Sequence, residues 1–135
     1  MAASQRGRPP RDPRRRLGDA GERLAVGYLE QRGYRVIDRN VRRREGEVDL
    51  VAVDGVGSAA TLVFVEVKLR RSRPTGRAIE ALGVRKQRRL RALAEAYSMD
   101  HPDLPEALRI DLVAIDLDRR GAIASIEHVR SAVEG

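Results

Sequence analysis

The sequence predicts an α/β fold in which one helix, three strands, a second helix and a further strand build a mixed central sheet. Two apolar, β-branched runs, 48–53 and 61–67, are of strand length and flank a turn containing Gly and Ser, which indicates a hairpin. Apolar residues recur at helical spacing in 17–33 and again in 84–99. The second helix lies between the third and fourth strands, as the crossover of a parallel pair requires.

The elements before the hairpin begin with a basic tail. Residues 1–16 contain six arginines, three prolines and little apolar content, so we expect disorder there and one domain over 17–135. The tail is either a basic arm for nucleic acid or a solvated extension. A helix over Leu17–Gly33 is expected to end at Gly33, and a strand over Tyr34–Val41 follows. A basic turn, either solvated or in contact with phosphate, then comprises Arg42, Arg43 and Arg44.

A second set of basic residues follows the hairpin. A loop contains Arg70, Arg71 and Arg73, and a short helical turn is expected at Ala78–Leu82. The helix Val84–Met99 is basic in its first half, through Arg85, Lys86, Arg88 and Arg89. Positive charge there opposes the helix dipole, and a bound phosphate would remove that cost. The alternative is a solvated face.

The rest of the chain supplies two more strands. Leu108–Asp116 is expected to be buried, with Asp111 neutralising a nearby arginine, and Ile123–Val129 is a weaker final strand. His101, in the connector before them, is expected to be exposed. His128 has no partner that the sequence identifies.

Composition excludes several classes of protein. There is no cysteine among the 135 residues, which removes disulfides, thiolate catalysis and cysteine-ligated zinc. No apolar run approaches the roughly 20 residues of a membrane span, and no apolar segment follows the N-terminal arginines as a secretory signal would require. We therefore expect a cytoplasmic protein that does not enter membranes.

The positive charge of the chain is concentrated in its tail. The net charge is +7, and residues 1–16 account for +5 because six arginines face only Asp12. The remainder is close to balanced, so affinity for phosphate has to come from local clusters. Aromatic residues are only 3% of the chain, which argues against a base-stacking platform and favours recognition of duplex or branched DNA by shape.

Three charged residues interrupt the apolar hairpin. Asp49 lies on the first strand, and Glu66 and Lys68 share one face of the second. Buried acids are costly unless a cation compensates them, and a divalent metal such as Mg²⁺ would do so, with Lys68 as a further charge. The alternative is a structural ion-pair network. Glu47 shares the face of Asp49, but we expect it to lie in solvent at the entrance of the strand.

These motifs resemble a known family. Asp49 followed by the E-x-K of Glu66–Lys68 is similar to the PD-(D/E)XK nuclease superfamily, which includes the Holliday-junction resolvases. The blocks GEVDL at 46–50, FVEVK at 64–68 and KQRRL at 86–90, with G-E-x-x-A at 21–25, resemble the YraN-like family of small bacterial proteins. The resemblance covers roughly residues 17–116 and implies a restriction-endonuclease-like core.

The resemblance also implies a function. Asp49 and Glu66, helped by the carbonyl of Val67, would hold Mg²⁺ or Mn²⁺ for endonucleolytic hydrolysis of a phosphodiester in DNA or RNA. Lys68 would act on the attacking water or on the charge that develops on phosphate. Glu22 would contact a metal-bound water, or else would simply be a favourable acid in a first helical turn.

Two other functions stay open. One is a module of the same fold that binds nucleic acid without cutting it, and the other is a small protein whose arginine tail docks on an acidic partner. Resolvases act as dimers, so a homodimer is an alternative to a monomer, although no stretch of the sequence marks an interface.

Overall fold

The computed structural model describes residues 13–71 and 78–133. The predicted tail therefore lies largely outside the described residues, as does Arg73. Within these residues, two α-helices, two 3-10 turns and five strands follow one another: α1 Pro13–Gln31, β1 Arg35–Arg43, β2 Gly46–Asp54, η2 Gly57–Ala59, β3 Thr61–Arg71, η3 Ala78–Ala81, α2 Val84–Asp100, β4 Ala107–Leu117 and β5 Ile123–Val129.

The five strands form one mixed sheet whose spatial order is the order of the chain, β1-β2-β3-β4-β5. The β1–β2, β2–β3 and β4–β5 pairs are antiparallel. Strands β3 and β4 are parallel, in register from Thr61 opposite Ala107 to Arg71 opposite Leu117. Helix α2 makes the crossover between them, as the element order predicts.

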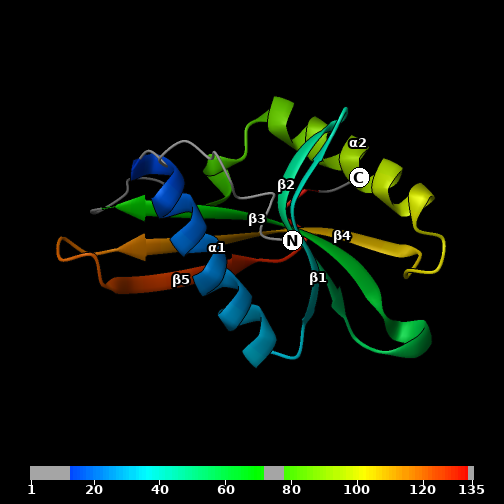
Figure 1. Ribbon diagram of the computed structural model, residues 1–135, viewed down its shortest axis with the longest axis horizontal. Helices are drawn as coiled ribbons and strands as arrows, with labels where there is room; N and C mark the ends of the chain where they lie inside the picture. Colours follow the sequence, from blue (N-terminus) through cyan, green and yellow to red (C-terminus); the bar gives the residue numbers. More distant parts are fainter. Residues whose placement is uncertain (1–12, 72–77, 134–135) are drawn as a thin grey trace, which may run out of the picture.

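The sheet has a helix on each face, so the fold has three layers (Figure 1). Alternation along β3 separates the two cores: Phe64 packs with the Leu90 and Leu93 side chains of α2, and Val63 and Val65 pack toward α1. Glu66 has the parity of Phe64, which places it on the α2 side of the sheet.

The boundaries differ from the prediction at α1, at the β1–β2 turn and in β3. Arg70 and Arg71, expected in a loop, are the last residues of β3 and pair with β4. Helix α1 begins at Pro13 and not at Leu17, so the end of the expected tail is helical. Arg42 and Arg43 are the last residues of β1, and the turn itself consists of Arg44 and Glu45. Gly33 follows the end of α1 with φ 88°, a conformation that glycine adopts without strain.

Both histidines have partners, and His101 is less exposed than expected. His101 is half-buried and stacks on Tyr97, with ring centroids 4.1 Å apart. His128 Nε2 lies 2.8 Å from Asp111 Oδ2. Arg109 donates two hydrogen bonds to Asp111, which confirms the predicted arginine partner for this fully buried acid. Neither described helix is long and apolar enough to span a membrane.

Candidate functional site

Strands β2 and β3 separate at one end, beside Asp49. Their pairing begins at Leu50 of β2, which lies opposite Val65 of β3. One residue before Leu50, the Asp49 carboxylate accepts a hydrogen bond from the backbone N–H of Val67, with an N···O distance of 2.7 Å. The Asp49 side chain thus satisfies a backbone donor where the ladder between β2 and β3 ends. The carboxylate therefore sits at the opening of the sheet.

Glu66 meets Asp49 at this opening. The whole Glu66 residue is only 7% exposed, and its carboxyl group lies close enough to that of Asp49 for each to perturb the pKa of the other. Burial and the charge of Asp49 raise the pKa of Glu66 to about 7. Burial also raises the pKa of Asp49, against the opposing effects of the Val67 N–H and of Lys86. Two carboxyl groups in one desolvated site resist simultaneous ionisation, and a cation would relieve that cost.

The lysine that contacts this pair is Lys86, where the sequence analysis expected Lys68. Lys86 Nζ forms a salt bridge with Glu66 Oε2, and the Lys86 side chain is 48% exposed against 9% for Glu66. Burial lowers the pKa of Lys86, but the hydrogen bond and charge of Glu66 outweigh it and raise the pKa overall. Lys68 is exposed near the end of β3. Lys86 reaches the carboxylates because α2 packs across the face of the sheet that Glu66 occupies.

The sequence contained a signal for Lys86 that its assignment to the basic helix obscured. Lys68 and Lys86 are the only lysines in the chain, and the other 25 of its 27 Lys and Arg residues are arginines. Lysine and arginine are not interchangeable, because an ammonium is a compact point charge on a flexible stem and a guanidinium is a planar fork. Both lysines therefore stood out, and only the packing of α2 shows which one meets Glu66.

Glu22 approaches the site from the opposite layer. Burial and the charge of Asp49 raise the pKa of Glu22, while a hydrogen bond from the Asn40 side chain lowers it. The structure thus places Glu22 within range of the Asp49 charge, and Asp49 within range of Glu66. Asn40 was not predicted; it has φ 51°, a left-handed conformation that asparagine tolerates better than most residues. Its amide lies near enough to the Glu22 carboxylate to oppose the rise in the pKa of that group.

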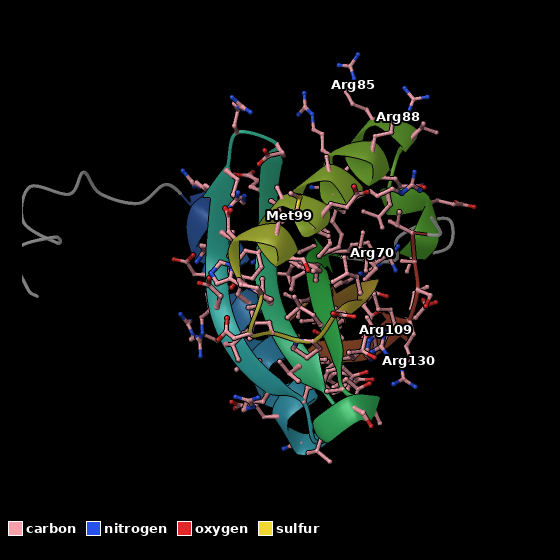
Figure 2. All side chains as sticks on the ribbon, turned by 90° about the vertical axis from the view of Figure 1, so that its right-hand side faces the viewer. Arg70, Arg85, Arg88, Met99, Arg109 and Arg130 are labelled. Atoms are coloured by element: carbon pink, nitrogen blue, oxygen red, sulfur yellow. The ribbon has the colours of Figure 1, made fainter. Side chains whose placement is uncertain are left out.

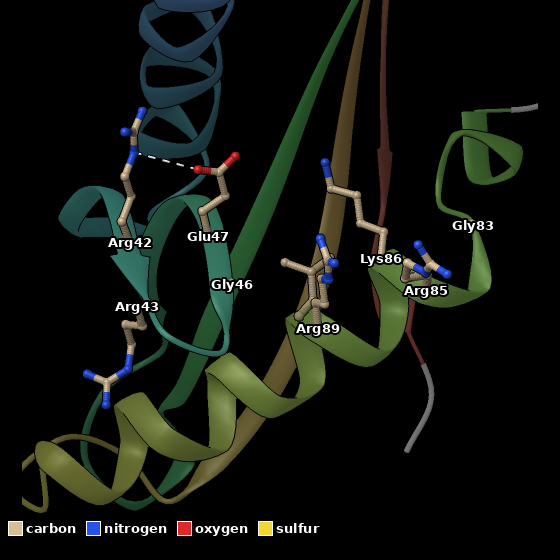
Figure 3. A pocket seen from close by; sticks show the side chains of 9 residues that line it. Arg42, Arg43, Gly46, Glu47, Gly83, Arg85, Lys86 and Arg89 are labelled. Carbon is tan, nitrogen blue, oxygen red and sulfur yellow. Dashed lines mark ion pairs between the residues drawn. The ribbon is translucent and has the colours of Figure 1, made fainter.

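A cleft of about 630 Å³ lies between the β1–β2 turn and the first half of α2 (Figure 3), and Lys86 connects it to Glu66. Arg42, Arg43, Gly46, Glu47, Gly83, Arg85, Lys86, Arg89 and Leu90 line it. At one end of the cleft the β1–β2 turn lies close to α2. A Cβ added to Gly46 would be only 3.3 Å from the Cβ of Arg89. Gly46 also has φ 153°, so a side chain there would meet both backbone strain and crowding.

Most cations of the cleft are available to a ligand. Arg42 and Glu47 are 3.6 Å apart with side chains 72% and 71% exposed, an ion pair worth little in water. Arg85 and Arg89 are exposed on α2, and Arg85 and Arg88 project away from the body of the protein (Figure 2). Glu47 lies in solvent at the strand entrance, as expected. The cleft therefore has an excess of positive charge at its rim.

Arg43 and Arg70, both predicted to contact phosphate, instead form hydrogen bonds with carboxylates of this chain. Arg43 donates to Asp100 at 2.6 Å and to Glu45 at 3.3 Å, and its side chain points away from Lys86 (Figure 3). Arg70 makes hydrogen bonds of 2.7 and 3.1 Å to Asp116 on β4. These two guanidiniums are held in place by carboxylates and fit a structural role better than a direct contact with nucleic acid.

The donor set fits a hard divalent cation through two carboxylates. Among the described residues, no group of three or more His, Cys, Asp or Glu side chains could hold a metal ion. Mg²⁺ does not need such a group, because it keeps several waters and commonly uses one or two carboxylates with substrate phosphates. Asp49 and Glu66 meet that requirement, and a cation would remove the cost that raises the pKa of both acids.

The chain belongs to the uncharacterised protein family UPF0102, whose model matches residues 21–115. A UPF0102 protein of Arthrobacter sp. is 46% identical over 114 residues, covering 84% of this chain and 92% of the relative. A UPF0102 protein of Roseiflexus castenholzii is 48% identical over 124 residues, covering 90% of this chain and 95% of the relative.

Among solved structures, the chain shows a distant likeness to Pyrococcus furiosus SfsA in complex with Ca²⁺. The TM-score is 0.38 and the sequence identity 21%, with 90% of this chain and 65% of that chain covered.

Proposed function

We propose that this protein is a metal-dependent phosphodiesterase with a restriction-endonuclease-like core that cuts DNA. The observation that carries the proposal is the pairing of buried Glu66 with half-buried Asp49, with Lys86 in contact with Glu66 and also lining an arginine-rich cleft. The order helix, three strands, helix, strand, with parallel β3 and β4, supports it. A structural ion pair is the weaker explanation, since it would not call for a second carboxylate beside a basic cleft.

Each residue has a distinct role in the proposal. Asp49 and Glu66, with the Val67 carbonyl, would hold Mg²⁺ or Mn²⁺, which when bound polarises a phosphoryl oxygen and acidifies a water. Lys86 would stabilise the negative charge that develops on the phosphate during cleavage. Glu22, fixed by Asn40, would orient water on the α1 side.

Fewer residues are proposed to contact nucleic acid directly than the sequence analysis predicted. Arg42, Arg85 and Arg89 line the cleft, and exposed Arg88 extends the basic surface of α2, so these would contact the DNA backbone with little reading of bases. The remaining arginines of the sequence prediction that the structure describes are Arg44 in the turn and Arg71 at the end of β3. We propose both as peripheral contacts.

The direct test incubates purified protein with linear, nicked, flapped and four-way DNA and with RNA, in Mg²⁺ or Mn²⁺. We expect cleavage by the wild type and loss of cleavage in Asp49→Asn and Glu66→Gln. Asp54→Asn is the matched control, because it changes an acid at the other end of the same strand. Metal should also raise the melting temperature of the wild type by mass action but not that of the two site variants.

If no substrate is cleaved while metal and DNA still bind, the nuclease proposal fails, and the result supports a module that binds nucleic acid without cutting it. Equal metal affinity in wild type, Asp49→Asn and Glu66→Gln would show that the proposed site is wrong.

The two lysines provide a second, internal test. Removing one electrostatic contact to a transition state typically costs about 10²- to 10³-fold in rate. We expect that loss for Lys86→Met in single-turnover cleavage at saturating protein, and a much smaller one for Lys68→Met. The reverse result would restore the role that the sequence analysis gave to Lys68.

A further inference from the structure

Lys86 belongs to two sites at once. Its ammonium contacts the Glu66 carboxylate, and the same side chain lines the cleft together with Arg85 and Arg89. About half of the side chain is exposed, so its flexible stem can turn without disturbing the packing of α2. The only acid among the cleft residues is Glu47, which Arg42 already faces.

A cation at the carboxylate pair competes with this ammonium. Glu66 is nearly buried, and its charge is balanced by Lys86 in the structure. A divalent cation held by Asp49 and Glu66 would supply that balance and repel the ammonium at short range. The displaced side chain has the cleft beside it, where it would add one more positive charge to Arg85 and Arg89.

We propose that the cleft binds a phosphodiester group and that Lys86 couples this binding to the metal. With metal bound, Lys86 leaves Glu66 and contacts the phosphate; with phosphate bound, Lys86 is held away from Glu66 and the metal site is free of its competitor. Each ligand therefore strengthens the other, as linkage requires. This inference rests on the proposed function, because it takes Asp49 and Glu66 as the metal ligands.

The features of the cleft select the chemical class of this ligand. Its charged lining is cationic except for Glu47, and it contains no aromatic side chain on which a base could stack. Its volume of about 630 Å³ lies in the range of small-molecule sites, roughly 300–1,000 Å³. The close approach of Gly46 to Arg89 bounds it at one end. A phosphate with its flanking sugar from one strand fits this description, and a whole duplex does not.

The experiment measures Mn²⁺ affinity by calorimetric titration with and without dimethyl phosphate, the smallest phosphodiester, at matched ionic strength. We expect dimethyl phosphate to tighten Mn²⁺ binding to the wild type about fivefold or more, within the usual range of coupling between sites. In Lys86→Met, Mn²⁺ should bind more tightly than to the wild type without dimethyl phosphate, and the added phosphodiester should change little. Lys68→Met removes the other lysine and should retain the coupling.

The outcomes separate this inference from the proposed function. A coupling that persists in Lys86→Met would come from direct contact between metal and phosphate, and would overturn the role of Lys86. The absence of coupling in the wild type would also overturn it, while leaving Asp49 and Glu66 as a metal site. If Mn²⁺ binds Asp49→Asn and Glu66→Gln as it binds the wild type, the metal site and the proposed function fail together.

Discussion

Glu66 shows at the scale of one residue how burial and neighbouring charge create a reactive group. Its carboxyl group is nearly removed from solvent and faces the carboxyl group of Asp49, and the pKa of Glu66 rises to about 7 as a result. Lys86 offsets part of that cost without removing it. An acid with such a pKa changes its charge near neutral pH, where a metal would compete with the proton.

This raised pKa predicts how stability depends on pH without metal. Between the ordinary value of 4.5 and about 7, the folded state keeps a proton on Glu66 that the unfolded state releases. The contribution of Glu66 to the free energy of unfolding should therefore fall as pH rises through this window. Denaturant unfolding across that range should show a shallower decline in Glu66→Gln than in the wild type. An identical pH profile in the two proteins would contradict the raised pKa.

Helix α1 contacts β3 at Gly21. A Cβ on Gly21 would lie 3.4 Å from the Leu69 Cβ and 3.7 Å from Val67 Cγ1, which are ordinary contact distances between apolar carbons. The next residue is Glu22, whose distance from Asp49 depends on that packing. Gly27, on the same helix, is exposed, and a Cβ there would meet nothing within 4 Å.

Both glycines should tolerate alanine. Gly27→Ala should stabilise the protein by about 0.5–1 kcal/mol, the usual gain from replacing glycine inside a helix. Gly21→Ala should gain at least as much, because its added methyl group would contact Leu69 and Val67 at ordinary distances. Thermal unfolding of both variants beside the wild type tests the comparison. A loss of stability in Gly21→Ala would show that α1 needs a closer approach to β3 than a methyl group allows.

At the scale of the whole molecule, a buried polar network ties the sheet to the end of the chain. Asp111 on β4 is fully buried and accepts hydrogen bonds from Arg109 and from the Ser131 backbone, with His128 also in contact. Arg109 extends the network to Asp54 at the end of β2. Burial opposes the charge on Asp111, but the bonds from His128 and Arg109 lower its pKa overall.

This network should carry stability and not catalysis. Asp111→Asn leaves the Arg109 charge without its main partner and should cost about 3 kcal/mol or more. Asp100→Asn is the control, because Asp100 is 59% exposed in its pair with Arg43 and should cost about 1 kcal/mol or less. Denaturant midpoints and cleavage rates of folded protein measure both effects. A large loss of cleavage in folded Asp111→Asn would place this cluster in the function.

The pH dependence of Asp111 has the opposite sign to that of Glu66. Because the pKa of Asp111 is lowered in the folded state, its ionised form stabilises the fold above the unfolded pKa. That contribution is lost as pH falls through the folded pKa. The two acids therefore act in different pH windows, and Asp111 matters mainly for resistance to acid.

The sequence by itself determined the element order, the parallel pair that α2 connects, and the two acids at the hairpin. Periodicity and spacing suffice for these because side chains within one strand or helix have a fixed geometric relation. Only the tertiary structure decided that Lys86 meets Glu66, that Asn40 lies near Glu22, and that Arg43 and Arg70 already have carboxylate partners. Those contacts join distant parts of the chain, so they depend on how α1 and α2 pack on the sheet, which no local pattern encodes.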